Sequence, residues 1–172
     1  MQDRCEKVAS LVDDGQPAVC WGQYNEECDL LEEMIPDAIQ VAGCDSDDVK
    51  ERRLEDFTFG RARVLVTKGK LAGLGLNWQH CGHQCFFPSH SFEMVYQSIR
   101  RSLRFGRTDP VAIDIVSTQG EEGVMKNLEK KQARADRMFE ALVRHMNDGV
   151  SVEMREAHTK EARIPEWLSS TR

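Results

Sequence analysis

Five short apolar runs, each separated from the next by a polar stretch or a glycine-rich loop, most constrain the fold of this chain. They are AVCWG (18–22), AIQVAG (38–43), ARVLVT (62–67), QCFFP (84–88) and PVAIDIVS (110–117). Runs this short and this uniformly apolar are typical of strands buried on both faces. Because parallel strands need crossover connections, usually helices, the pattern predicts an α/β three-layer domain with a mainly parallel sheet flanked by helices.

Amphipathic segments with start and stop signals fill the gaps between these runs. The predicted helices begin at residues 1, 25, 45, 91 and 121 and end near residues 14, 35, 60, 105 and 146. No linker-like segment occurs before about residue 147. We therefore expect one domain over residues 1–147, including a C-terminal helical extension, and a tail over 148–172 that is partly helical or disordered.

Composition narrows the class of protein. No run approaches the eighteen or more apolar residues of a membrane span, and the charged start MQDRCEKVAS does not resemble a signal peptide. The six cysteines have no regular spacing, which favours reduced thiols. We expect a protein without membrane contact in the cytoplasm.

Charge is segregated along the chain, although the net charge is −6. Residues 1–49 hold 2 Lys/Arg and 13 Asp/Glu, whereas residues 50–107 hold 11 Lys/Arg and 4 Asp/Glu. The acidic average argues against general nucleic-acid binding. The basic middle predicts one surface that meets an anion.

The stretch YQSIRRSLRFGR concentrates arginines within that middle. On a helix, an apolar stripe would anchor it to the core, formed by Phe92, Val95, Tyr96, Ile99 and Leu103. Arg100, Arg104 and Arg107 would share the opposite flank, with Arg101 beside Arg104. Like charges at these spacings repel, and guanidinium groups suit phosphate oxygens. A phosphate-binding element and a solvated basic face both fit this pattern.

A glycine-rich loop, KGKLAGLGLN (68–77), follows the third apolar run. Its glycines allow close backbone approach to a ligand and its lysines can hold phosphate, although a plain tight turn fits equally. It is not a Walker A loop, because Leu71 stands where Ser or Thr belongs.

The segment HCGHQC carries zinc-type side chains at His80, Cys81, His83 and Cys85. Their spacing fits no common structural site, and Cys85 falls within a predicted strand. We expect no metal here, and metal analysis of the purified protein would test the alternative of a metal-binding module.

Taken together, these segments resemble the second RecA-like lobe of superfamily-two helicases, closest to Swi/Snf-type DNA translocases and phage-encoded DEAD/DEAH-like helicases. GRARVLVTKGKLAGLGLNWQ looks like motif V, YQSIRRSLRFGRTDPV looks like motif VI, and AVCWGQYNEECDLLEEMI is similar to motif IV. A fourth segment matches the family at Gly43, Lys50, Phe57 and Gly60. The likeness covers residues 16–145 in the family's order.

The resemblance implies a role for particular residues in an ATP-dependent DNA motor. Arg101 and Arg104 would be arginine fingers toward the ATP γ-phosphate, and Gln97 would organise that catalytic interface. The motif V loop would contact nucleotide through Gly73, Gly75 and Asn77. Thr67 and Lys68, with Gln23 and Tyr24 as further candidates, would face the backbone of double-stranded or forked DNA.

The sequence also departs from the family. Arg100 and Arg107 stand where Gly and Gln are usual, so their roles stay open. The chain has no Walker A sequence and no Asp-Glu dipeptide for Walker B. The resemblance places these elements, which bind ATP and Mg²⁺, on an N-terminal RecA-like lobe of the same protein or of a separate chain. We expect this chain alone to hydrolyse ATP at background rates; the alternative function is a non-motor nucleic-acid-binding or regulatory module.

Overall fold

The computed structural model describes residues 1–71, 76–89 and 91–159 of the 172-residue chain. The chain divides into two compact units, Met1–Glu129 and Lys130–Arg172. Over the described residues, the strands are β1 (Ala18–Trp21), β2 (Ala38–Val41), β3 (Val64–Thr67), β4 (His83–Phe86) and β5 (Ala112–Ile115). The helices are α1 (Gln2–Leu11), α2 (Asn25–Met34), α3 (Asp47–Thr58), α4 (Phe92–Ser102) and α5 (Glu122–Thr159), with a 3-10 turn at Gln119–Glu121.

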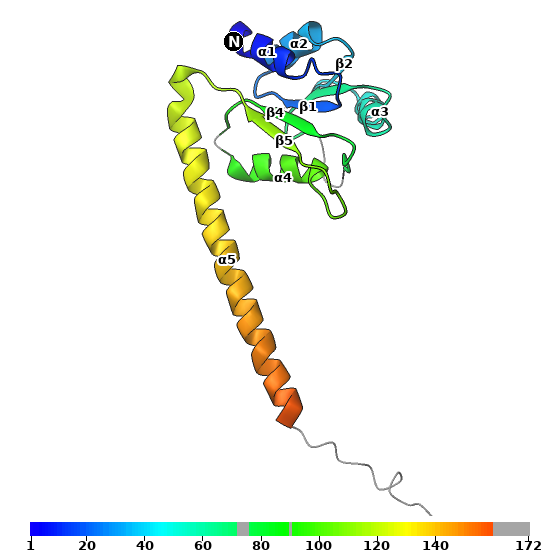
Figure 1. The fold of residues 1–172 in the computed structure, drawn as a ribbon. Coiled ribbons are helices and arrows are strands. Elements are labelled where there is room, and N and C mark those ends of the chain that lie inside the picture. The colour runs from blue at the N-terminus through cyan, green and yellow to red at the C-terminus, as the bar shows by residue number, and fades with distance from the viewer. Residues whose placement is uncertain (72–75, 90, 160–172) are drawn as a thin grey trace, which may run out of the picture. The chain divides into compact units, whose positions relative to one another are not determined.

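Within the described residues, five strands form one sheet in the order β2-β3-β1-β4-β5, and every neighbouring pair is parallel. Helices α1 and α2 cover one face of this sheet, whereas α3 and α4 cover the other (Figure 1). The predicted three-layer α/β architecture is confirmed. The strands alternate between two buried clusters, which explains why they are apolar throughout.

The core on the α1/α2 face is rich in small side chains. Its strand residues include Cys20, Val64, Val66 and Cys85, and α1 contributes Cys5, Val8 and, just beyond its end, Val12. The opposite face holds the large aromatic side chains Trp21, Phe57, Trp78 and Phe86. The two faces therefore differ in character, and the aromatic face borders the candidate site described below.

The predicted C-terminal helical extension is confirmed as α5, which continues past residue 147 to Thr159. Among the described helices, none has an apolar stretch long enough to cross a bilayer.

Helix α4 is shorter than expected. It ends at Ser102, because Leu103 adopts φ −85° and ψ 83° and Gly106 turns the chain at φ +91°. Arg104 and Arg107 thus lie in the following loop and do not share a helical flank with Arg100. The apolar stripe is also narrower than predicted, since Tyr96 and Leu103 are 42% and 52% exposed.

Candidate nucleotide and nucleic-acid site

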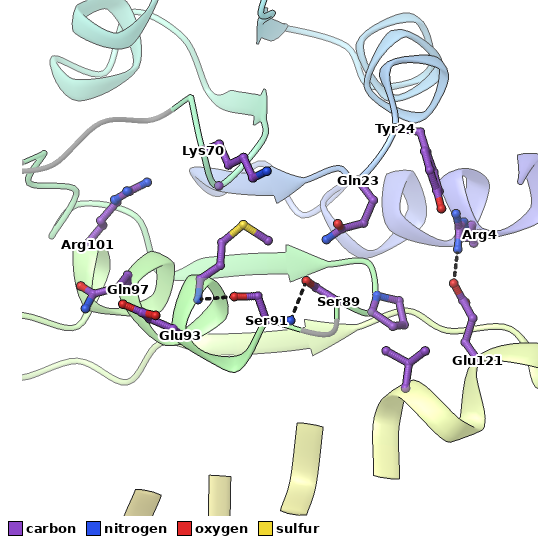
Figure 2. Close-up of a pocket in the computed structure, with 14 residues that line it drawn as sticks. Arg4, Gln23, Tyr24, Lys70, Ser89, Ser91, Glu93, Gln97, Arg101 and Glu121 are labelled. Carbon is purple, nitrogen blue, oxygen red and sulfur yellow. Dashed lines mark hydrogen bonds and ion pairs between the residues drawn. The ribbon is translucent and has the colours of Figure 1, made fainter. Parts of the chain in front are cut away.

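The connections after β1 and β4 diverge, and this divergence creates the candidate site. Helix α2 leads from β1 toward β2 at one edge of the sheet and packs on one face. Helix α4 leads from β4 to β5 at the other edge and packs on the opposite face. Ligands in open parallel sheets bind where such connections separate, at the carboxyl ends of the strands. A pocket of about 750 Å³ lies at this position (Figure 2).

Residues from several parts of the first unit line this pocket. After β1 come Gln23 and Tyr24, after β3 come Gly69 and Lys70, and after β4 come Pro88 and Ser89. Ser91 and four residues of α4 (Glu93, Met94, Gln97 and Arg101) line it, and Arg4, Glu121 and Val124 complete it. Gly69 permits the close approach of the β3 loop to α4, because a Cβ at that position would lie only 2.4 Å from Met94 Cγ.

Arg101 is the most constrained of these side chains. It is only 9% exposed, and its guanidinium carbon lies 5.3 Å from the Trp21 ring centroid and 5.6 Å from that of Trp78. Both aromatic faces attract the cation. Burial lowers the pKa of Arg101, yet an arginine stays charged at neutral pH. The structure therefore holds a fixed positive charge at the edge of the pocket.

Buried hydrogen bonds fix the two tryptophans in turn. Trp21 Nε1 donates to Gln84 Oε1 at 3.0 Å, and Gln84 Nε2 donates to Ser102 Oγ at 2.7 Å. Trp78 Nε1 donates to Thr58 Oγ1 at 3.0 Å. Gln84 is completely buried in the middle of β4. These contacts determine where the Arg101 guanidinium lies, and sequence reasoning missed them because their members are far apart in the chain.

The other residues expected at the nucleotide lie in different settings. Gln97 lines the pocket with Arg101. Arg104 is exposed and its Nη1 donates to the Leu76 carbonyl at 3.3 Å, so it lies against the end of the loop after β3 rather than in the pocket lining. Asn77 is exposed, and its side-chain oxygen accepts a hydrogen bond from the Gln79 backbone. Gly73 and Gly75 lie outside the described residues.

Of the residues expected to contact nucleic acid, some line the pocket and others do not. Gln23 and Tyr24 line the pocket, and Tyr24 is 59% exposed. Lys68 is partly exposed and its Nζ donates to Asn25 Oδ1 at 2.5 Å. Thr67 is fully buried and its hydroxyl donates to the Val41 carbonyl at 3.3 Å. In this structure the Thr67 side chain thus faces the sheet interior rather than solvent.

An ion-pair network closes the other end of the pocket (Figure 2). Arg4 on α1 pairs with the fully buried Glu27, and at 2.7 Å with Glu121. Glu27 also accepts hydrogen bonds from the backbone N–H groups of Gln23 and Tyr24 at 2.9 and 3.1 Å. Burial alone would raise the pKa of Glu121, but hydrogen bonds from Thr118 and Arg4 lower it below its ordinary value. The network fixes the loop after β1.

The two arginines left without a role by the sequence have distinct contacts. Arg107 is a structural clamp: it donates to the carbonyls of Gln79, of Cys81 at 3.1 Å and of Asp109 at 2.8 Å. It therefore connects the loop after α4 to the segment before β4. Arg100 is exposed, donates to the Tyr96 hydroxyl at 2.7 Å and lies over that ring.

The residues of this site fit the terminal phosphate of a nucleotide better than they fit its metal ion. The carboxylates lining the pocket are Glu93 and Glu121, and Glu121 is occupied by Arg4. Within the described part of the chain, one group of side chains has the spacing of metal ligands, formed by His83, Cys85 and Asp114, and none of its members lines the pocket.

Comparison with known proteins bears on the fold. No protein-family model and no curated protein sequence matches this chain. Solved structures do match: the C-terminal domain of the DEAD-box protein Dbp5 aligns with a TM-score of 0.63 and 18% identity over 76% of this chain and 79% of that one. The C-terminal part of the Fun30 ATPase domain aligns with a TM-score of 0.62 and 15% identity over 73% of this chain.

This chain has the fold of a C-terminal RecA-like helicase lobe. A second Dbp5 structure, a variant C-terminal domain from S. cerevisiae bound to a Gle1 variant and IP6, matches with a TM-score of 0.62 and 15% identity over 76% of this chain and 79% of that one. The chain spans only 44% of the Fun30 chain that it matches. The expected resemblance to the second lobe of superfamily-two helicases is therefore confirmed at the level of the fold.

Proposed function

We propose that this lobe is the C-terminal motor lobe of an ATP-dependent helicase or translocase of superfamily two. It supplies arginines to an ATP site that an N-terminal RecA-like lobe completes. The observation that carries the proposal is the placement of Arg101, a buried cation packed against two adjacent tryptophan rings, at the edge of a pocket where the fold predicts a ligand.

Pre-organisation gives Arg101 its proposed role. A cation already fixed in a partly desolvated position stabilises charge that develops on a transferred phosphoryl group without reorganising during the reaction. Arg104, on the loop that follows α4, supplies a second guanidinium from an exposed position. Gln97 lies one helical turn before Arg101 and supports the same interface.

The triphosphate and Mg²⁺ belong to the complete enzyme. Bound Mg²⁺ would neutralise phosphate charge there, and its ligands would come from the N-terminal lobe, since the carboxylates of this pocket do not form a magnesium site. This lobe contributes the guanidinium groups and, through Lys68, Gln23 and Tyr24, a surface for the phosphate backbone of DNA.

Reconstitution tests the proposal. The purified chain is assayed for DNA-stimulated ATP hydrolysis alone and together with a Walker A-containing lobe encoded in the same or a neighbouring reading frame. Activity should appear only in the mixture. Robust hydrolysis by this chain alone would contradict the assignment of half an active site.

The alternative, a nucleic-acid-binding module without motor activity, draws support from the lysines of the β3 loop, Lys68 and Lys70. It predicts tight DNA binding by the chain alone with a steep dependence on salt, and no gain of ATPase activity on adding an N-terminal lobe.

A further inference from the structure

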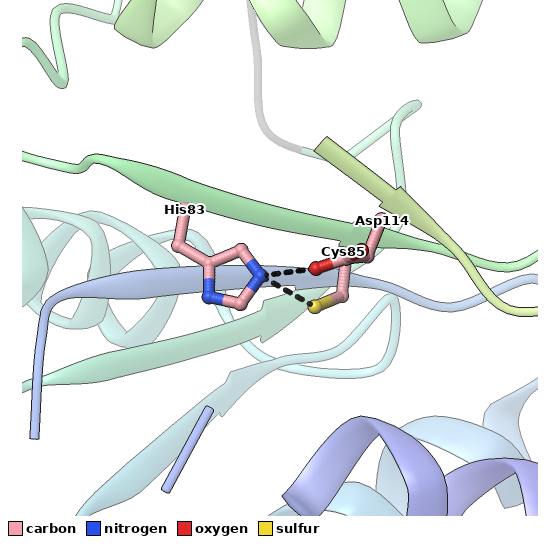
Figure 3. Close-up of side chains that lie close together, drawn as sticks. All are labelled: His83, Cys85 and Asp114. Carbon is pink, nitrogen blue, oxygen red and sulfur yellow. Dashed lines mark hydrogen bonds and ion pairs between the residues drawn. The ribbon is translucent and has the colours of Figure 1, made fainter. Parts of the chain in front are cut away.

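Three potential metal ligands converge on the sheet face covered by α1 and α2. His83 and Cys85 are two residues apart on β4, so both side chains point to this face. Asp114 on β5 lies directly beside Cys85 in the parallel register. His83 Nε2 lies 2.7 Å from Asp114 Oδ2 and 3.5 Å from Cys85 Sγ (Figure 3). All three donor atoms lie within 4.8 Å of one another.

The arrangement differs from a thiol–imidazole–carboxylate relay. In a relay the carboxylate and the nucleophile contact opposite nitrogens of the imidazole ring. Here both partners contact the same nitrogen, Nε2, which carries at most one proton. If Nε2 donates its proton to the Asp114 carboxylate, it has no lone pair left to accept a hydrogen bond from the Cys85 thiol. A single cation could instead be bound by all three atoms at once.

A tetrahedral zinc ion would require one adjustment of this spacing. Zinc bonds of about 2.3 Å to sulfur and about 2.0–2.2 Å to nitrogen and oxygen place tetrahedral ligands about 3.6 Å apart for S and N and about 3.4 Å apart for N and O. The Cys85–His83 distance already matches, and the His83–Asp114 distance must open by about 0.7 Å. We propose that His83, Cys85 and Asp114 form a Zn²⁺ site.

The three side chains differ in exposure, from a buried thiol to a half-exposed carboxylate through which a metal ion could enter. Cys85 is 1% exposed, the His83 side chain is 11% exposed and the Asp114 side chain is 42% exposed. The exposed carboxylate gives a route to solvent and the freedom to adjust. Cys20 neighbours Cys85 on β1 but is not part of the group, so these three side chains account for three of the four positions of a tetrahedral ion.

Bound zinc would crosslink β4 and β5 at the edge of the sheet. Strand β5 pairs only with β4 among the described strands, and its residues are exposed or half-buried. A metal shared by β4 and β5 ties this edge strand down. The expected effect is thermodynamic: Zn²⁺ at about one hundred times its dissociation constant should raise Tm by about 5–10 °C.

The test uses the full chain, freed of metal with a chelator and then titrated with Zn²⁺, or with Co²⁺ as a spectroscopic probe. We expect about one Zn²⁺ per chain, and a thiolate-to-cobalt charge-transfer band that is lost in Cys85→Ser. Asp114→Asn, which changes a half-exposed side chain without changing its size, should weaken Zn²⁺ binding by more than about tenfold, since even outer-shell partners contribute that much.

Matched controls separate this site from adventitious binding. His80→Gln changes the neighbouring histidine, which packs against Phe57, and Cys44→Ser removes the exposed thiol. Neither should alter the stoichiometry or the charge-transfer band. The proposal is overturned if the chain binds no Zn²⁺, if Asp114→Asn binds it as tightly as the unaltered chain, or if binding follows His80 or Cys44.

Discussion

Replacing Gln84 with leucine tests whether the buried network fixes Arg101. Gln84 is fully buried and joins the Trp21 indole to the Ser102 hydroxyl through bonds of 3.0 and 2.7 Å. Leucine has a similar size and shape but neither accepts nor donates. Gln84 Nε2 also donates to the Ser98 carbonyl at 3.3 Å, so the change removes three hydrogen bonds while leaving little cavity.

The expected cost follows from the groups left behind. A buried donor or acceptor without a partner costs about 1–3 kcal/mol. The Ser102 hydroxyl can still pair with the nearby Cys81 thiol, whereas the Trp21 indole N–H loses the partner found here. We expect Gln84→Leu to lower the free energy of unfolding by about 2–4 kcal/mol.

Urea denaturation followed by circular dichroism measures this change in the isolated chain. Gln2→Leu makes the same substitution at an exposed position of α1 and should stay within about 0.5 kcal/mol of the unaltered protein. Adding Trp21→Phe to Gln84→Leu should cost less than the sum of the two single changes, because the orphaned indole is removed. A Gln84→Leu protein as stable as the Gln2→Leu control would refute the reasoning.

Three further predictions follow from the site. Arg4→Ala leaves Glu27 buried without its partner and should destabilise the chain by about 3–5 kcal/mol in the same urea assay, and a loss below 1 kcal/mol would contradict the network. Because the folded-state pKa of Glu121 lies below its ordinary 4.5, its contribution to stability is present above about pH 4.5 and is lost as the pH falls through the folded pKa. Between pH 7 and pH 3, the Tm should therefore fall less steeply for Glu121→Gln than for the unaltered chain. Parallel curves of Tm against pH would count against this contribution. Lys68→Ala in the assembled enzyme should reduce the salt slope of DNA binding by about one, measured by fluorescence anisotropy, whereas Lys7→Ala on α1 should leave the slope unchanged.

Local patterns in the sequence predict which segments form strands and where the helices begin. The apolar runs become strands, and the helices begin within two residues of their expected positions, because burial on both faces and helical periodicity are local properties. The end of α4 was placed too late, since the pattern through Leu103 stays compatible with a helix while its backbone dihedrals leave the helical region.

Tertiary contacts explain what local pattern could not supply. The sequence suggested that Arg101 lies on a solvated or phosphate-facing flank, yet it is buried against Trp21 and Trp78, which are brought together by the order of the strands. Similarly, spacing within HCGHQC could not show that His83 and Cys85 lie beside a carboxylate, because Asp114 comes from the neighbouring strand β5. Such contacts depend on strand order and register, which periodicity does not encode.

The most direct test of the proposed motor lobe compares two adjacent arginines in the assembled enzyme. DNA-stimulated ATPase is measured for the complete two-lobe protein carrying Arg101→Ala or Arg100→Ala. Loss of an arginine finger typically costs a factor of about 10³–10⁵ in kcat, so Arg101→Ala should abolish turnover while Arg100→Ala, which removes an exposed side chain, retains most of it. Equal activity of the Arg101→Ala and unaltered enzymes, with DNA binding intact, would contradict the central claim.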